Sequence, residues 1–353
     1  MWPLFLRDLG AAPQDIGLVF GVGNLVAATC FLPAGYLADR VGRKPILVLA
    51  WVMSTIGAAA FLPLQDWHWA FVGSALYWSG SAAVPVMTAQ LAATTDRRVL
   101  GRAIGIVFGA YFFGNIIGAP FAGALGATIG LRETIGVAVV MFVISSAFTF
   151  GVRSFPPMTE RVRLRLPATF WTLLAITPLA SGLSIVSIAL LPVYLRDIAA
   201  IPLERIGVYV GLVALGSALL AAANGRLADG IGPVPALLGA STILTAAAAL
   251  MAFAGRAEPV IALAAFLLGA TQAANPVLAA AVERILPPSR VALGYATYQL
   301  AFAIGFGGGG VAAGFLYEAE PLLPFIVTVA LALPVAAIVA LILTRITAVQ
   351  AAA

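Results

Sequence analysis

The sequence predicts an all-α integral membrane protein. Its 353 residues include only 19 basic and 14 acidic side chains, whereas 62% of the chain is hydrophobic and the mean hydropathy is +1.06. Such sparse charge cannot cover a water-facing surface, because soluble domains carry about 25% charged residues. The apolar residues form runs of about 20, the length that a helix needs to cross a bilayer, rather than the short alternating segments of an outer-membrane barrel.

Each long apolar run is predicted to form one helix, because lipid offers backbone groups no hydrogen-bond partner. Charges, glycines and prolines mark the breaks between runs. The chain contains eleven such runs, near 16–38, 45–64, 69–92, 102–125, 134–152, 170–191, 206–228, 234–254, 260–282, 291–316 and 325–343. The connections are short except for the basic stretch around 153–167.

Basic residues are distributed unevenly between the two sides of the predicted membrane. With eleven spans the chain ends lie on opposite sides, and the connections divide into one set with fourteen basic residues and another with five. Lys and Arg concentrate on the cytoplasmic side of membrane proteins. We therefore expect a multi-pass protein of the inner or plasma membrane, with residues 1–15 outside and the C-terminus in the cytoplasm. The isoelectric point of 9.7 then reflects topology and not affinity for nucleic acid.

The chain contains an internal repeat. PLFLRDLGAAPQDIG at 3–17 recurs as PVYLRDIAAIPLERIG at 192–207, and GYLADRVG at 35–42 recurs as GRLADGIG at 225–232. The offset is 189 residues and becomes 190 after one inserted residue. Repeats of this kind are typical of secondary transporters, whose two halves are related by symmetry.

The two copies of the repeat differ in what precedes them. A complete apolar span, 170–191, comes before Pro192, whereas only two residues come before Pro3. We therefore interpret the eleven spans as twelve minus the first, in an N-terminal half (1–152) and a C-terminal half (170–353) that a cytoplasmic loop (153–169) joins. The alternative, a native eleven-helix protein with its N-terminus outside, obeys the charge rule equally well.

The first predicted cytoplasmic turn reads Gly35-Tyr-Leu-Ala-Asp39-Arg40-Val-Gly42-Arg43-Lys44-Pro45. It resembles the loop signature of the major facilitator superfamily, G-x-x-x-D-R-x-G-R followed by Arg or Lys, with every marked position filled. Because the motif lies between two spans, is echoed at 225–232 and belongs to a 6+6 repeat, the resemblance covers the whole chain. It implies an alternating-access secondary transporter, with two six-helix bundles that rock about a site near the membrane midplane.

Elementary chemistry accounts for part of this motif. Gly42 permits a tight turn that a Cβ would strain, and the basic residues Arg40, Arg43 and Lys44 meet anionic headgroups at the cytoplasmic face. Alternatively, these basic residues serve only to set the topology of the protein in the membrane.

A carboxylate at this boundary needs a cation or a helix N-terminus beside it. The resemblance implies that Asp39 helps to hold the cytoplasmic side closed, and Arg43 with Asp96 is the candidate contact. We call the set the cytoplasmic gate motif; it comprises Gly35, Asp39, Arg40, Gly42, Arg43, Lys44 and Asp96.

The 102–125 run contains Gly105, Gly114, Gly118, Pro120 and Gly123. The pattern resembles one found in the antiporter branch of the superfamily, although an alanine precedes the proline and the final glycine pair is single. Gly114, Gly118 and Pro120 are candidate helix-bending residues, because proline frees a backbone carbonyl. Close helix packing by the glycines is the alternative.

The resemblance implies that the first, fourth, seventh and tenth helices line the cavity, which here are the missing helix and the runs 69–92, 170–191 and 260–282. Polar residues lie at helical spacing on these runs and on flanking ones, and polar groups in a membrane protein tend to face its interior. Interhelical hydrogen bonding is the alternative for each. The predicted cavity residues are Asn24, Tyr77, Ser81, Thr88, Tyr111, Asn115, Thr177, Ser181, Ser184, Gln272, Asn275, Tyr295, Tyr298 and Gln299.

No charged residue or His falls in the middle of a predicted span. A proton-coupled carrier usually needs a titratable group within its pathway. If protons are the coupling ion, the titratable group must come from the missing helix or from an acid at the border of a span, such as Asp15 or Glu283. Otherwise proton coupling is absent. A lining without charge favours a small neutral or amphipathic substrate over an anionic one.

The sequence contains no phosphate-binding glycine loop, HExxH motif or nucleophile elbow. His68 has no second His or carboxylate at metal-ligand spacing and fits the aromatic belt of a membrane interface. We therefore predict neither an enzyme nor a cofactor or metal site. The expected partners are a small-molecule substrate and the lipid bilayer. The predicted function is export of a small neutral or amphipathic solute; a sugar or metabolite importer and a transport-inactive sensor or assembly subunit are the alternatives.

Overall fold

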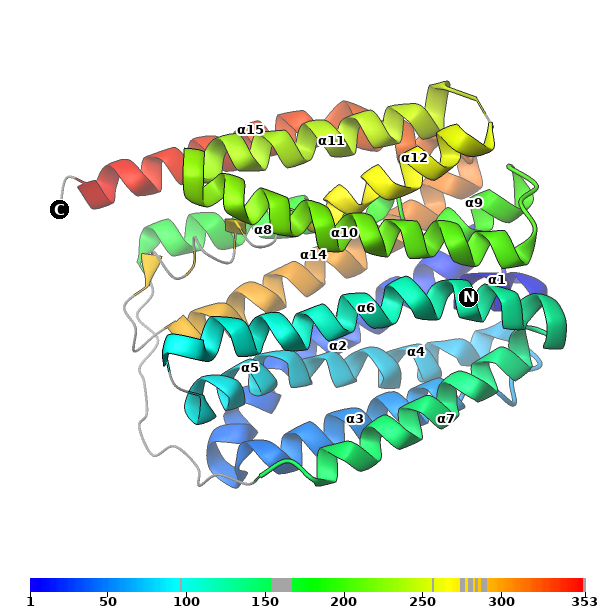
Figure 1. Cartoon of the computed structure of the whole chain (residues 1–353), viewed down its shortest axis with the longest axis horizontal. Coiled ribbons are helices and arrows are strands. Elements are labelled where there is room, and N and C mark those ends of the chain that lie inside the picture. The colour runs from blue at the N-terminus through cyan, green and yellow to red at the C-terminus, as the bar shows by residue number, and fades with distance from the viewer. Residues whose placement is uncertain are drawn as a thin grey trace.

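The computed structural model describes residues 1–95, 97–153, 167–255, 257–273, 277–278, 282, 285–286 and 291–351. Within these residues every regular element is a helix. The long helices run side by side, with the N-terminus near one end of the bundle and the C-terminus at the other (Figure 1). We call these the N-terminal end and the C-terminal end of the molecule.

The first half starts at the N-terminal end and contains nine helical elements among its described residues. They are α1 (Trp2–Asp8), α2 (Pro13–Val41), α3 (Arg43–Ala59), the 3₁₀ turn η1 (Trp67–Trp69), α4 (Ala70–Ser79), the 3₁₀ turn η2 (Gly80–Ala82), α5 (Ala83–Thr94), α6 (Arg97–Ile129) and α7 (Leu131–Phe150).

The second half has a matching order of helices after its opening helix. They are α8 (Ala168–Val186), α9 (Leu191–Asp197), α10 (Leu203–Ile231), α11 (Pro233–Phe253), α12 (Glu258–Leu268), the 3₁₀ turn η3 (Gly269–Gln272), α14 (Val291–Ala319) and α15 (Leu323–Ala351).

Eight helices among the described residues are long and apolar enough to cross a membrane. They account for eight of the eleven predicted runs. The other three runs contain α3, the α4–η2–α5 segment and the α12–η3 segment, so all eleven runs contain helix. In the last two of these runs a 3₁₀ turn interrupts or ends the α-helix, a detail that the hydropathy pattern did not predict.

The two 3₁₀ turns begin at Gly80 and Gly269, which are 189 residues apart, the offset of the internal repeat. Both glycines lie against a neighbouring backbone. A Cβ on Gly80 would be 2.6 Å from the carbonyl oxygen of Ala50, and one on Gly269 would be 2.7 Å from the Cα atom of Gly216. At both glycines the narrower 3₁₀ winding coincides with the close approach of another helix, a tertiary effect that hydropathy does not reveal.

The two halves meet along the helix pairs α2–α14 and α6–α10. A Cβ on Gly17 would be 2.7 Å from the Cα atom of Gly314, and one on Gly207 would be 2.9 Å from the Cα atom of Gly123. Gly207 is the repeat equivalent of Gly17, so the two contacts are related by the pseudo-twofold symmetry. Small residues let helix backbones approach in this way inside a membrane, where the hydrophobic effect does not drive helices together.

These close approaches do not continue to the C-terminal end. Gly35 lies fourteen residues after Gly21 on α2, and Gly225 lies fourteen after Gly211 on α10, each close to the same helix face. Among the described residues, no heavy atom of a neighbouring element comes within 4 Å of a Cβ built on Gly35 or Gly225, whereas Gly21 and Gly211 are in tight contact. Along these faces the halves therefore approach most closely toward the N-terminal end.

A second glycine face distinguishes the halves. On α14, Gly305 and Gly309 contact the backbone of α8 at Pro178 and Gly182. On α6, Gly114 and Gly118 have the same spacing, but no heavy atom of the described chain lies within 4 Å of a Cβ built on either. The helix packing that α8 provides in the second half thus has no counterpart at these two glycines.

Candidate functional site

Six of the polar side chains predicted to line the cavity donate a hydrogen bond to a backbone carbonyl three or four residues earlier in the chain. Asn24 Nδ2 donates to the Phe20 carbonyl at 2.9 Å, and Thr177 Oγ1 donates to the Leu173 carbonyl at 2.8 Å. Ser81, Thr88, Asn115 and Ser184 donate in the same manner. These bonds satisfy donors where water is absent, yet the side-chain oxygens keep lone pairs that can accept from a ligand.

Ser181 is different because its hydroxyl lies close to a carbonyl of another helix as well as to the Pro178 carbonyl of its own helix, which is 3.3 Å away. Its Oγ lies 3.0 Å from the carbonyl oxygen of Phe302, and the residue is 3% exposed. The bond joins α8 to α14 next to the Gly305 contact. Ser181 therefore forms an interhelical hydrogen bond, which was the alternative to a role in lining the cavity.

Four aromatic residues follow one another along α14. The ring centroids of Tyr295 and Tyr298 are 6.0 Å apart, those of Tyr298 and Phe302 are 6.4 Å apart, and those of Phe302 and Phe306 are 5.8 Å apart. Tyr298 is 2% exposed, and its hydroxyl has no hydrogen-bond partner within the described part of the chain. Gln299, one turn from Tyr295, is half-buried.

Tyr77 lies in an aromatic cluster of the first half. Its ring meets Trp2 edge-on with a centroid distance of 4.4 Å and Phe142 at 5.6 Å, and Trp2 stacks on Phe61 at 4.4 Å. Tyr111, in contrast, is 65% exposed. Sequence reasoning missed Trp2, Phe61 and Phe142, because apolar rings carry no polar signal that separates a binding face from a core.

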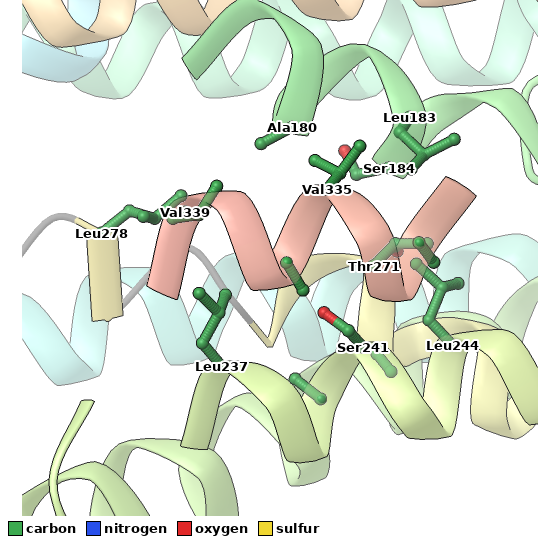
Figure 2. Close-up of a pocket in the computed structure, with 14 residues that line it drawn as sticks. Ala180, Leu183, Ser184, Leu237, Ser241, Leu244, Thr271, Leu278, Val335 and Val339 are labelled. Atoms are coloured by element: carbon green, nitrogen blue, oxygen red, sulfur yellow. The ribbon is translucent and has the colours of Figure 1, made fainter. Parts of the chain in front are cut away.

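A small cavity lies inside the second half rather than between the halves. Its volume is about 50 Å³, and side chains from α8, α11, α15 and the η3 region surround it (Figure 2). Ser184, Ser241 and Thr271 contribute hydroxyl groups to the lining, and the Thr271 hydroxyl has no partner among the described residues. Ser184 was a predicted cavity residue; Ser241 was missed because α11 is not among the helices implied to line the pathway. The cavity has room for ordered water.

The cytoplasmic gate motif lies at the C-terminal end of the molecule, where α2 ends and α3 begins. Gly42 adopts a φ of +93°, a conformation that favours glycine, and so joins the two helices. The Arg40 guanidinium lies 4.4 Å from the ring centroid of Tyr36, while Arg43 and Lys44 form the first turn of α3. Asp39 is in the last turn of α2.

Other predicted site residues either lie outside the described residues or form part of a helix. Asp96 and Asn275 lie outside the described residues, as does the side chain of Asp39. Gln272 ends η3. Pro120 lies inside α6 without interrupting it, and its ring packs against Gly211.

The described residues contain no group of three or more His, Cys, Asp or Glu side chains that could hold a metal ion. His68 Nδ1 lies 2.5 Å from Asp66 Oδ1, and the His68 ring stacks on Trp67. Hydrogen bonds from the backbone and ring of His68 lower the pKa of the Asp66 carboxyl. This arrangement stabilises the turn before α4 and has too few ligands for a metal site.

A group of charged residues at the N-terminal end was not predicted to have a role. Helices α1 and α9 pack together there (Figure 1). Arg7 Nε lies 3.0 Å from Asp197 Oδ2, and Arg196 Nη1 lies 2.7 Å from Asp8 Oδ1. We call these four residues the Arg–Asp network. The signal that could have found it is the Leu-Arg-Asp triplet that occurs in both copies of the repeat.

A family model described as Major Facilitator Superfamily matches residues 1–181 and 170–352. The multi-drug resistance efflux pump PmrA of Streptococcus pneumoniae is 26% identical over 250 residues, which cover 65% of this chain and 62% of that protein. The multidrug resistance protein MdtG of Salmonella typhi is 29% identical over 309 residues, covering 80% of this chain and 74% of that protein. The match thus spans less than two thirds of the length of PmrA.

Solved structures share the fold. A crystal structure of a mutant of the nucleoside transporter NupG superposes with a TM-score of 0.76 at 14% sequence identity, covering 98% of this chain and 94% of that one. At this identity the likeness concerns the architecture of the two bundles alone.

Proposed function

The chain belongs to the major facilitator superfamily, and on this premise we propose that it exports small neutral or amphipathic solutes across the plasma membrane by alternating access. As a member of this superfamily it is a multi-pass membrane transporter and not an enzyme. The substrate class, the direction of transport and the cytoplasmic location of the C-terminus are the parts that we propose.

The observation that carries the proposed substrate class is the chemistry of the helices that would line the pathway. The described candidates offer hydroxyl, amide and phenol groups, and every ion pair between described residues lies near the N-terminal end. An anion that leaves water needs a cation or several donors to offset its lost hydration. Neutral and amphipathic solutes make no such demand. The proposed direction is supported by the name of one relative, a multi-drug resistance efflux pump, and the other relative is named a multidrug resistance protein.

Alternating access is supported by the asymmetry between the two ends of the molecule. The Gly17–Gly314 and Gly123–Gly207 contacts hold the halves together toward the N-terminal end, while Gly35 and Gly225 have no neighbour within 4 Å among the residues that the structure describes. With the C-terminus in the cytoplasm, this arrangement corresponds to a state closed on the outside. The halves 1–152 and 170–353 would move as bodies, with the 153–169 loop joining them.

The cytoplasmic gate motif would then act in the opposite state. We propose that Asp39, Arg43 and Asp96 help to hold the C-terminal end closed in that state. Interactions at helix ends of about 0.3–2 kcal/mol each can bias a two-state equilibrium without locking it. Gly114, Gly118 and Pro120 would allow α6 to adjust as the halves rock.

Cellular accumulation of a fluorescent amphipathic dye tests the direction. Cells that express the protein should retain less dye than cells that express the Asp39→Asn variant at the same level in the membrane. Greater retention with the native sequence would identify an importer instead. No difference for neutral, amphipathic or sugar probes, with a protein partner bound at fixed stoichiometry, would identify a transport-inactive subunit.

A further inference from the structure

We propose that Arg7, Asp8, Arg196 and Asp197 form a second gate, which holds the N-terminal end of the pathway closed and opens when α1 and α9 separate. The inference rests on the proposed alternating access and adds the residues that control the end opposite to the cytoplasmic gate motif. Three contacts carry it: Arg7 Nε to Asp197 Oδ2 at 3.0 Å, Arg196 Nη1 to Asp8 Oδ1 at 2.7 Å, and Arg196 Nε to Asp197 Oδ1 at 3.1 Å.

The network has the symmetry of the two halves. Arg196 and Asp197 are the repeat equivalents of Arg7 and Asp8, at the offset of 189 residues. The arginine of each half binds the aspartate of the other half, so the contact is reciprocal. Two of the three ion pairs therefore cross between the halves, and neither can persist when the ends of the halves move apart.

Helix α1 is attached to the first half by contacts that do not involve the network's aspartates. The guanidinium of Arg132 on α7 lies 5.2 Å from the ring centroid of Phe5. It also donates to the carbonyl oxygens of Leu62 and Leu64 beyond the end of α3. Arg7 donates to the carbonyl of Ala11 at 3.2 Å. Motion of the first half is therefore transmitted to Arg7 and Asp8.

Helix α9 is attached to the second half in a comparable way. Tyr194 packs edge-on against Phe325 of α15 with a centroid distance of 5.1 Å, and its hydroxyl lies 3.5 Å from the carbonyl oxygen of Met251 at the end of α11. Val193 and Leu195 are fully buried. The two pairs of charged residues are thus carried by separate bodies, as a gate requires.

The exposure of the network suits a contact that must break in every transport cycle. The side chains of Arg7, Asp197 and Arg196 are 37%, 25% and 27% exposed, and that of Asp8 is 52% exposed. Ion pairs at this depth are partly screened by water and are individually weak. We expect their loss to shift the closed-to-open ratio by on the order of tenfold.

Distance measurement by double electron–electron resonance tests the gate without a transport substrate. Spin labels are attached in nanodiscs to cysteines at Gln65 and Ala257, two exposed positions at the N-terminal end of different halves, in a Cys30→Ser background. The test variant is Arg7→Gln with Arg196→Gln. The rescue variant exchanges one pair, Arg7→Asp with Asp197→Arg. The control is Arg205→Gln, which breaks the Arg205–Glu258 pair within the second half.

The gate predicts a larger population at long distance in the double-Gln variant, the native distribution in the exchanged pair, and no change in the control. An unchanged distribution in the double-Gln variant, or an equal change in the control, would overturn it. If the double-Gln variant does not fold, the Asp8→Asn and Arg7→Gln single variants supply the same comparison. A protein that moves no solute but shows the predicted distances would refute the proposed export and leave the gate standing.

Discussion

Gly207 of α10 and Gly123 of α6 are in backbone contact across the interface between the halves, where a Cβ on Gly207 would lie 2.9 Å from the Cα atom of Gly123. Gly207→Ala should therefore destabilise the protein by about 1–3 kcal/mol, because the added methyl group overpacks the contact. Thermal unfolding in detergent, followed by intrinsic fluorescence, measures the effect.

Gly225 on the same helix provides the matched control. No heavy atom from another described element lies within 4 Å of its built Cβ, so Gly225→Ala should be neutral or should stabilise the helix by up to about 1 kcal/mol. Equal losses of stability in the two variants would show that the glycines act through the helix backbone and not through contact between the halves.

Ser181 and Ser184 allow a direct comparison on one helix face of α8. The Ser181 hydroxyl bonds the Phe302 carbonyl of α14, whereas the Ser184 hydroxyl bonds within its own helix. Ser181→Ala should lower stability by about 0.6–1.7 kcal/mol, the range for interhelical hydrogen bonds in membranes, and Ser184→Ala should have a smaller effect. The same unfolding experiment checks both, and a larger loss for Ser184→Ala would contradict the assignment.

Tyr298 tests whether a polar group without a partner takes part in substrate binding. Its hydroxyl is buried and has no hydrogen-bond partner among the described residues. Tyr298→Phe should weaken binding of a neutral hydrogen-bonding solute by roughly 2- to 10-fold without lowering thermal stability, as measured by equilibrium binding to the purified protein. Unchanged affinity with increased stability would place this hydroxyl outside the binding site.

The cytoplasmic gate motif predicts a difference between two equivalent aspartates. Asp39→Asn should leave membrane insertion intact and reduce transport by roughly 2- to 30-fold, the range for losing one such helix-end interaction. Asp229 is the repeat equivalent of Asp39, but no basic residues follow Gly232 as they follow Gly42. Asp229→Asn should therefore reduce transport less. Full transport by Asp39→Asn would refute the gating role.

The sequence predicted the helices and the family well because both depend on local composition and repeats. Runs such as 206–228 and 234–254 became α10 and α11 with boundaries within three residues. The 3₁₀ turns at Gly80 and Gly269 were not predictable in the same way, because they occur where a second helix backbone happens to pass. Hydropathy contains no information on that approach.

The candidate site was harder to predict than the fold. A serine at helical spacing can bond its own backbone, as Ser184 does, or a neighbouring helix, as Ser181 does, and the sequence pattern is the same. The Arg–Asp network was missed because its pairing depends on how the halves dock. The two Leu-Arg-Asp triplets were visible in the repeat, but only their reciprocal placement gives them a role.

Counterflow in proteoliposomes tests whether the protein transports neutral and amphipathic solutes, and it needs no knowledge of the coupling ion. Vesicles loaded with an unlabelled dye scaffold are diluted into labelled neutral, cationic amphipathic and phosphorylated forms of that scaffold, and the labelled compound taken up is counted. We expect uptake of the neutral and amphipathic forms, reduced uptake of both with the Asp39→Asn variant, and no uptake of the phosphorylated form. Equal or preferred uptake of the phosphorylated form would contradict it.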